Sequence, residues 1–158
     1  MKLKASVDYG VRAVLYLAAK GETCSSREIS EEMCVPRDYL IQLALRLRNA
    51  GIIKARPGKN GGYLLAKDPD KITVKQIMDA FDNDLKHVRQ PIKKKRNANP
   101  TVLAVMEMHG TVMESLNAYL DCLTVQDVLT AQSNEESLND VIAAALDEGA
   151  ARLRAKKK

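Results

Sequence analysis

The sequence predicts a mostly α-helical protein, in which a winged helix-turn-helix domain with a small β-hairpin wing precedes a long dimerisation helix. Three observations support this fold. Within residues 25–63, two helical patterns lead directly into a Gly-rich hairpin. From residue 100 onward, apolar residues recur at alternating steps of three and four. Tryptophan is absent and aromatic residues make up 4% of the chain, which favours helices packed on helices over a large sheet.

Two helices are predicted at the start of the chain. Residues 3–19 carry apolar side chains at amphipathic spacing, which indicates the first helix. Ser25 and Glu28 have the spacing of a capping box, whose side chains bind the free N–H groups at a helix start. A short second helix is therefore expected over residues 26–33, with Ile29 and Met33 on its apolar face.

A third helix is predicted over residues 37–50. It follows Val35-Pro36, which ends the second helix because a residue before proline avoids the α region. Gly51 stands where a C-terminal cap belongs. The apolar face of this helix is expected to contain Leu40, Leu43, Leu47 and Ala50. In a helix-turn-helix, this is the helix that reads bases.

A hairpin and a fourth helix complete the first domain, residues 1–81. Ile52-Ile53 and the run at residues 63–65 are β-prone and are separated by KARPGKNGG, a turn-rich and basic loop that predicts the wing. Thr73 and Gln76 again have capping-box spacing. The apolar face of the helix that follows is expected to contain Val74, Ile77, Met78 and Phe81.

The rest of the chain divides into three predicted parts. Residues 82–100 include KKKR and show little apolar periodicity, which indicates a basic loop or disordered linker. Residues 100–132 contain the long helix and a short capped helix from residue 124. Residues 133–158 contain a final helix, capped by Ser133 with Glu136, and a frayed basic tail. The dimer seam of the long helix is predicted to consist of Val102, Val105, His109, Val112, Leu116 and Tyr119.

The charge is distributed unevenly. Residues 1–80 carry 14 Lys and Arg against 9 Asp and Glu, whereas residues 97–158 carry 5 against 9. A basic N-terminal half and an acidic C-terminal part fit a nucleic-acid-binding domain joined to a helical part with another role. No apolar stretch reaches the roughly 20 residues of a membrane span, and no signal-peptide pattern is present, so we expect a cytoplasmic protein without membrane contact. No nucleophile, base and orienting group stand at recognisable spacing, which argues against an enzyme.

Several motifs occur in the order typical of one family of bacterial regulators. EISEEM, VP..YL, QL...LR.AGII and GGY together resemble the Rrf2 family of transcriptional regulators. The resemblance is close over residues 1–81, from YGVRAVLYLA to ITVKQIMDAF, and looser over YLDCLTVQDVL at residues 119–129. It implies a dimer that places the third helix in the major groove of DNA and the wing near the minor groove.

The resemblance also implies which residues face DNA. Arg and Gln can read base edges, hydroxyls and helix N-termini bind phosphate, and paired glycines let a backbone come close. A further arginine, Arg46, is expected to contact phosphate rather than bases. The expected DNA-binding residues are Ser26, Arg27, Arg37, Asp38, Tyr39, Gln42, Arg46, Arg56, Lys59, Asn60, Gly61 and Gly62.

Many members of this family hold an iron–sulfur cluster on three closely spaced cysteines between the fourth helix and the long helix. This chain has no cysteine between Cys34 and Cys122, and residues 82–100 offer only His87. We therefore expect no cluster, no other cofactor and no metal site. Cys24, Cys34 and Cys122 have two interpretations that remain open, namely buried structural thiols or a thiol sensor.

These observations predict a sequence-specific regulator, a repressor, that binds a pseudo-palindromic operator as a homodimer. The alternative is a protein-interaction or sensory module that uses the same helices to dock a partner protein, with or without DNA binding. The signal is open at this stage: a thiol oxidant, a small-molecule effector or a partner protein would each be compatible with the sequence.

Overall fold

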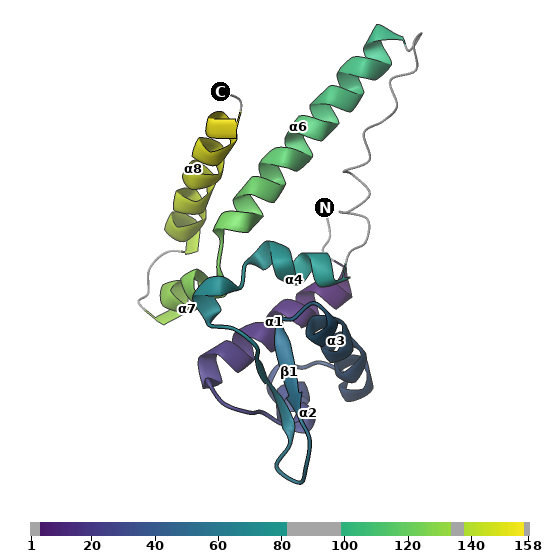
Figure 1. Cartoon of the computed structure of the whole chain (residues 1–158), viewed down its shortest axis with the longest axis vertical. Coiled ribbons are helices and arrows are strands. Elements are labelled where there is room, and N and C mark those ends of the chain that lie inside the picture. The colour runs from purple at the N-terminus through teal and green to yellow at the C-terminus, as the bar shows by residue number, and fades with distance from the viewer. Residues whose placement is uncertain (1–3, 82–98, 134–137, 157–158) are drawn as a thin grey trace.

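The computed structural model describes residues 4–81, 99–133 and 138–156. One body contains the N-terminal helices and a two-stranded antiparallel hairpin, and two helices extend from it side by side (Figure 1). The predicted fold class is confirmed. In chain order the elements are α1 (Ala5–Lys20), α2 (Ser26–Glu32), α3 (Arg37–Asn49), β1 (Ile53–Arg56), β2 (Gly62–Leu65), the 3-10 turn η1 (Pro69–Lys71), α4 (Val74–Phe81), α6 (Pro100–Cys122), α7 (Val125–Ser133) and α8 (Leu138–Lys156).

Three predicted caps are present as hydrogen bonds. Ser25 Oγ accepts the Glu28 N–H at 3.1 Å, and Thr73 Oγ1 accepts the Gln76 N–H at 3.2 Å. At the start of α7, the Thr124 N–H donates to Asp127 Oδ2 at 2.8 Å, and Thr124 Oγ1 accepts the Asp127 N–H at 3.1 Å. Each of these bonds satisfies a backbone N–H that has no partner within the helix, and a cap of this kind contributes about 1 kcal/mol.

The C-terminal region differs from the prediction. Ser133 is the last residue of α7, and Glu136, its predicted partner in the cap, lies outside the described residues. The helix α8 runs from Leu138 to Lys156, so most of the predicted frayed tail is helical. Arg152 donates to Glu148 at 2.6 Å, an i, i+4 pair of the kind that supports a helix over this stretch.

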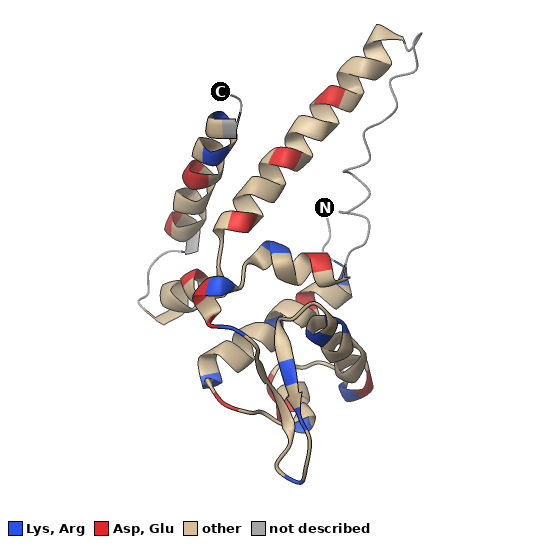
Figure 2. Cartoon of the chain, viewed as in Figure 1, with Lys and Arg blue, Asp and Glu red and all other residues tan. Residues whose placement is uncertain are grey.

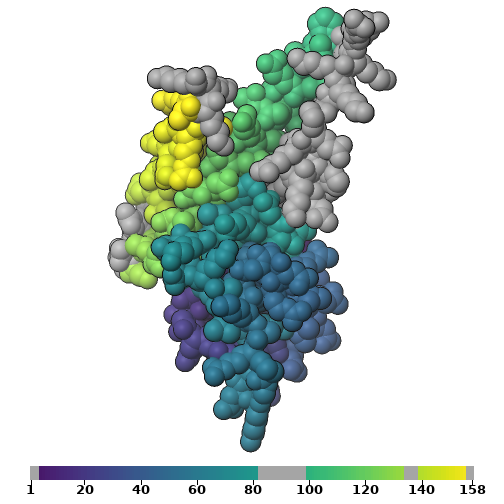
Figure 3. Space-filling view, viewed as in Figure 1, coloured from purple at the N-terminus to yellow at the C-terminus, as the bar shows by residue number. Residues whose placement is uncertain are grey.

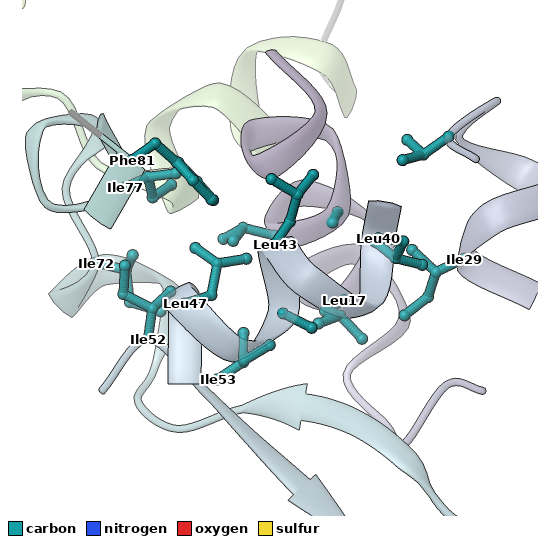
Figure 4. Close-up of a cluster of buried hydrophobic side chains, with 14 of the residues drawn as sticks. Leu17, Ile29, Leu40, Leu43, Leu47, Ile52, Ile53, Ile72, Ile77 and Phe81 are labelled. Carbon is teal, nitrogen blue, oxygen red and sulfur yellow. The ribbon is translucent and has the colours of Figure 1, made fainter. Parts of the chain in front are cut away.

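The core of the first body is formed by one face of each of its helices (Figure 4). Leu40, Leu43 and Leu47 of α3 are fully buried, as predicted. The predicted Ala50 is exposed, because it lies just beyond α3, which ends at Asn49. Ala44, the residue after Leu43, is buried with the leucines instead. Burying each such leucine contributes about 1.5–3 kcal/mol. The other fully buried side chains include Leu17, Ile29, Ile52, Ile72 and Ile77.

A short backbone bridge fixes the long helix to this body. The Val74 N–H donates to the Leu123 carbonyl at 2.8 Å, and the Val125 N–H donates to the Ile72 carbonyl at 2.9 Å. The C-terminal end of α6 also packs on α8, where Cys122, Leu123 and Ala145 form a second small core. Within the described residues, no helix has both the length and the apolar character needed to cross a membrane.

The start of α6 agrees with the sequence, because Asn99 Oδ1 accepts the Thr101 N–H at 2.8 Å directly before Pro100. The predicted basic linker falls almost entirely outside the described residues, as does His87.

Candidate nucleic-acid interface

The turn between α2 and α3 sets the angle of the reading helix. Cys34 adopts the left-handed conformation, with φ of 53°, at the position where a helix often ends on glycine. The Val35 N–H then donates to the Ser30 carbonyl at 3.1 Å, and Ser30 Oγ donates to the Val35 carbonyl at 2.6 Å. Arg37 Nε reaches back to Ser26 Oγ at 3.3 Å. These bonds join the starts of the two helices, so the predicted Ser26 and Arg37 lie together.

The outward face of α3 carries part of the predicted site. Asp38 and Gln42 are exposed on the side opposite the buried leucines. Tyr39 is half-buried, and its ring meets that of Tyr9 edge to face with 6.0 Å between centroids. Tyr39 therefore packs within its own chain, whereas Gln42 is free to reach a base edge.

The wing projects from the body at the end opposite α6 and α8 (Figures 1 and 3). Its two strands are antiparallel, with Ile53 opposite Leu65 at one end and Arg56 opposite Gly62 at the other. Arg56, Lys59 and Asn60 are exposed, as is Lys54, which the sequence interpretation did not include. Basic residues are visible along the wing and around α3 in Figure 2. A wing of this charge is suited to phosphate contact.

Gly61 and Gly62 of the wing are required by the hairpin itself. A Cβ at Gly62 would lie 2.1 Å from the Cys24 carbonyl oxygen, and a Cβ at Gly61 would lie 2.3 Å from the Arg56 carbonyl oxygen. Gly62 allows the wing to meet the segment before α2, where Cys24 and Tyr63 exchange backbone hydrogen bonds of 2.9 and 2.8 Å. These contacts inside the chain require glycine at both positions, whether or not the two residues also approach DNA as the family resemblance implies.

Replacing Gly62 with alanine is expected to lower the free energy of unfolding by about 1–3 kcal/mol, because the new methyl group meets backbone that must shift. Urea unfolding followed by circular dichroism would measure the change. Gly110→Ala is the comparison variant and should change stability in the opposite direction, since a Cβ there meets nothing within 4 Å in the protomer and alanine favours the helix by about 1 kcal/mol. An unchanged midpoint for Gly62→Ala would contradict the close contact with Cys24.

The two remaining arginines of the predicted site have different surroundings. Arg27 is exposed and pairs with Glu31 at 2.9 Å, so a phosphate would compete with that carboxylate. Arg46 lies on the flank of α3 that faces α4, where it lines a cavity of about 580 Å³ with Gln76, Asp79 and Phe81. Arg46 is thus separated from Gln42, which lies in a groove on the wing side.

That groove, of about 260 Å³, joins the reading helix to the wing. Its lining residues are Ile41, Gln42, Ala44, Leu45, Arg48, Ala55 and Tyr63. Ile41 and Leu45 are 44% and 49% exposed. The sequence interpretation omitted both, although a signal was present: they are apolar but fall outside the stripe of Leu40, Leu43 and Leu47.

The three cysteines lie in different surroundings. Cys24 is buried beside the wing, and Cys122 is buried between α6 and α8; burial raises the pKa of both thiols. Cys34 is exposed, which corrects the interpretation of all three as buried thiols. The reason is its place in the tight turn, where the left-handed backbone carries the residue at the surface.

These residues do not fit the iron–sulfur cluster that the family resemblance implies. The chain has only three cysteines, and they belong to the first body's core, the α2–α3 turn and the α6–α8 contact. A cluster needs several thiolates converging on one point. In residues 4–81, 99–133 and 138–156, no three His, Cys, Asp or Glu side chains are grouped to hold a metal ion.

Ellman's reagent is expected to modify one thiol rapidly in the folded protein and all three in denaturant. Exposed Cys34 should react first, because the other two thiols are buried and are less ionised at neutral pH. The measurement is the absorbance time course of the wild type beside Cys34→Ser. A rapid phase that survives in Cys34→Ser would show that a buried cysteine is accessible in solution.

The comparisons with known proteins agree with this geometry. Residues 3–131 match the Rrf2 family model, which is described as an iron-dependent transcriptional regulator. The regulator NsrR of Shouchella clausii is 28% identical over 145 residues, 90% of this chain and 95% of that protein. A helix-turn-helix-type protein of Synechocystis sp. is 40% identical over 87 residues, which span 54% of this chain and 59% of that protein.

Two solved structures have a similar fold. The Bacillus subtilis global cysteine regulator CymR superimposes with a TM-score of 0.67 at 27% identity, covering 82% of this chain and 97% of that one. IscR of T. potens superimposes with a TM-score of 0.68 at 28% identity, covering 87% and 91%. Because the family model spans most of the sequence and the winged helix is present, the chain belongs to the Rrf2 family of DNA-binding transcriptional regulators.

Proposed function

We propose that the protein is a homodimeric repressor that binds a pseudo-palindromic operator through two copies of α3 and the wing. The observation that carries the proposal is the separation of two surfaces. Exposed Gln42, Arg56 and Lys59 lie on the winged helix, and an exposed apolar row lies on the distant part of α6 (Figure 1). Repression requires only that the dimer occupy its DNA, so these two surfaces suffice.

On the DNA side, each residue type has a distinct task. Gln42 can form two hydrogen bonds with adenine in the major groove, which gives sequence preference. Arg56 and Lys59 neutralise phosphates, which gives affinity and salt dependence but little preference. Ser26 lies in the first turn of α2, where its hydroxyl can donate to a phosphate.

On the dimer side, the predicted seam is largely uncovered in the protomer. Val102, Val105 and Val112 are 50%, 55% and 58% exposed, and His109 is exposed beside them. Leu116 and Tyr119 are already half-buried, and Tyr119 packs with the second core against α8. A second copy of α6 would therefore cover mainly the N-terminal part of the row.

The direct test combines DNA binding with mass. Fluorescence anisotropy of labelled duplexes at several salt concentrations should show binding that weakens as salt rises. Sedimentation equilibrium should give a dimer. If the protein bound no duplex at low salt, not even in a pool of random sequences, the result would favour the alternative role of docking a partner protein.

Replacing Gly110 with alanine tests where two copies of α6 cross. Inside the protomer the added methyl meets nothing, so alanine should stabilise the helix by about 1 kcal/mol. If backbones of two subunits approach at Gly110, the dimer dissociation constant should rise tenfold or more. Sedimentation at several concentrations measures it, and unchanged dimerisation would place the crossing elsewhere along α6.

A further inference from the structure

The reading helix leaves two large apolar side chains uncovered. Ile41 and Leu45 are 44% and 49% exposed, although Leu40, Leu43 and Leu47 of the same helix are fully buried. The two residues are four apart, so they lie next to each other on one side of α3. Gln42 stands beside them and lines the same groove.

The surroundings of this pair indicate what would cover it. Arg48 from α3 lines the groove with them, and the opposite wall is Ala55 and Tyr63 of the wing. Lys54 and Arg56, the neighbours of Ala55 on β1, are exposed and lie on the other face of the same hairpin, because side chains alternate along a strand. An apolar strip with an arginine in its lining, next to a wing that carries further cations, suits a partner that presents small apolar groups between rows of negative charge.

The major groove of DNA has this chemistry. Its walls carry phosphates, and among its base edges the apolar group is the C5-methyl of thymine. A thymine methyl lies in the major groove of every A·T pair, including any pair whose adenine is read by Gln42. A protein partner would have to supply a matching set of carboxylates, whereas DNA presents its phosphates in two continuous rows.

We propose that Ile41 and Leu45 read thymine methyl groups in each operator half-site, next to the base pair that Gln42 contacts. This inference rests on the proposed DNA-binding role and adds the kind of base that the apolar pair selects. Operators should therefore contain thymine at one or two positions in each half-site beneath these side chains.

The test replaces single methyl groups in the DNA. An operator is first selected from random duplexes, and each thymine is then exchanged in turn for deoxyuridine, which lacks only the methyl. Wild-type affinity should fall about fourfold for each methyl that is buried, and should not change at other positions. Equal affinity for every thymine and deoxyuridine pair would overturn the proposal.

Substitutions in the protein test the same contact from the other side. Ile41→Ala and Leu45→Ala should bind the operator more weakly and lose the sensitivity to one or more of those deoxyuridine exchanges. Leu146→Ala is the matched control, because Leu146 is 50% exposed on α8 and lies away from the wing. If both α3 variants kept the full sensitivity, the pair would not be the reader. Failure to select any duplex would count against DNA binding itself, which is a different result.

Discussion

Replacing both Val105 and Val112 with glutamate is expected to convert the dimer to a monomer and to weaken operator binding by about 10²- to 10⁴-fold. The two valines are 55% and 58% exposed on the apolar row of α6. In a dimer, each new carboxylate would be buried against an apolar partner without a counter-ion. Each monomer would then bind one half-site alone and lose the advantage of a linked second site.

The matched control is the double variant Ala104→Glu, Thr111→Glu. Both residues are exposed on α6 but lie away from the row, on the side that natural Glu107 and Glu114 already occupy. Sedimentation equilibrium and anisotropy with the selected operator give the two readouts. A double valine variant that remains dimeric with full affinity would exclude this row as the interface.

The local patterns of the first domain were readable because each depends on residues close in sequence. The caps at Ser25, Thr73 and Thr124 each join a side chain to a backbone N–H three residues away, and all three are present. The leucine stripe of α3 likewise follows from helical periodicity alone. Element order and helix type could therefore be predicted before any tertiary contact was known.

Features that depend on contacts between distant residues were not readable. The close approach of Gly62 to Cys24 joins residues 38 positions apart, so the sequence did not reveal the structural role of this glycine. Similarly, periodicity showed that Arg46 lies off the buried stripe of α3, but only the position of α4 shows which flank it faces.

The long helix illustrates the same limit in a different way. Its apolar row was identified correctly as a row, but the sequence could not show that α8 would cover the end near Tyr119. A Cβ at Gly149 would lie 3.0 Å from the Tyr119 backbone nitrogen, so α8 approaches α6 closely there. The apolar row of α6 thus packs on α8 at its C-terminal end and, in our proposal, on a second subunit at its N-terminal end.

Replacing Arg56 and Lys59 together with alanine is expected to weaken binding to all duplexes and to flatten its salt dependence. If each residue contacts one phosphate, the dimer loses four contacts, and the slope of log affinity against log salt falls by about 3.6. The double variant Arg152→Ala, Arg154→Ala removes the same charge from α8, far from the wing, and should leave the slope nearly unchanged (Figure 1).

Gln42→Ala should behave in the opposite manner, because a neutral side chain that reads a base edge releases no counterions. Its salt slope should stay at the wild-type value, while its affinity for the selected operator falls by about 1–3 kcal/mol and its affinity for random DNA does not. Titrations of both duplexes at three or more salt concentrations separate the two effects. Equal losses on operator and random DNA would remove Gln42 from the reading role and leave base selection to other residues on the outward face of α3.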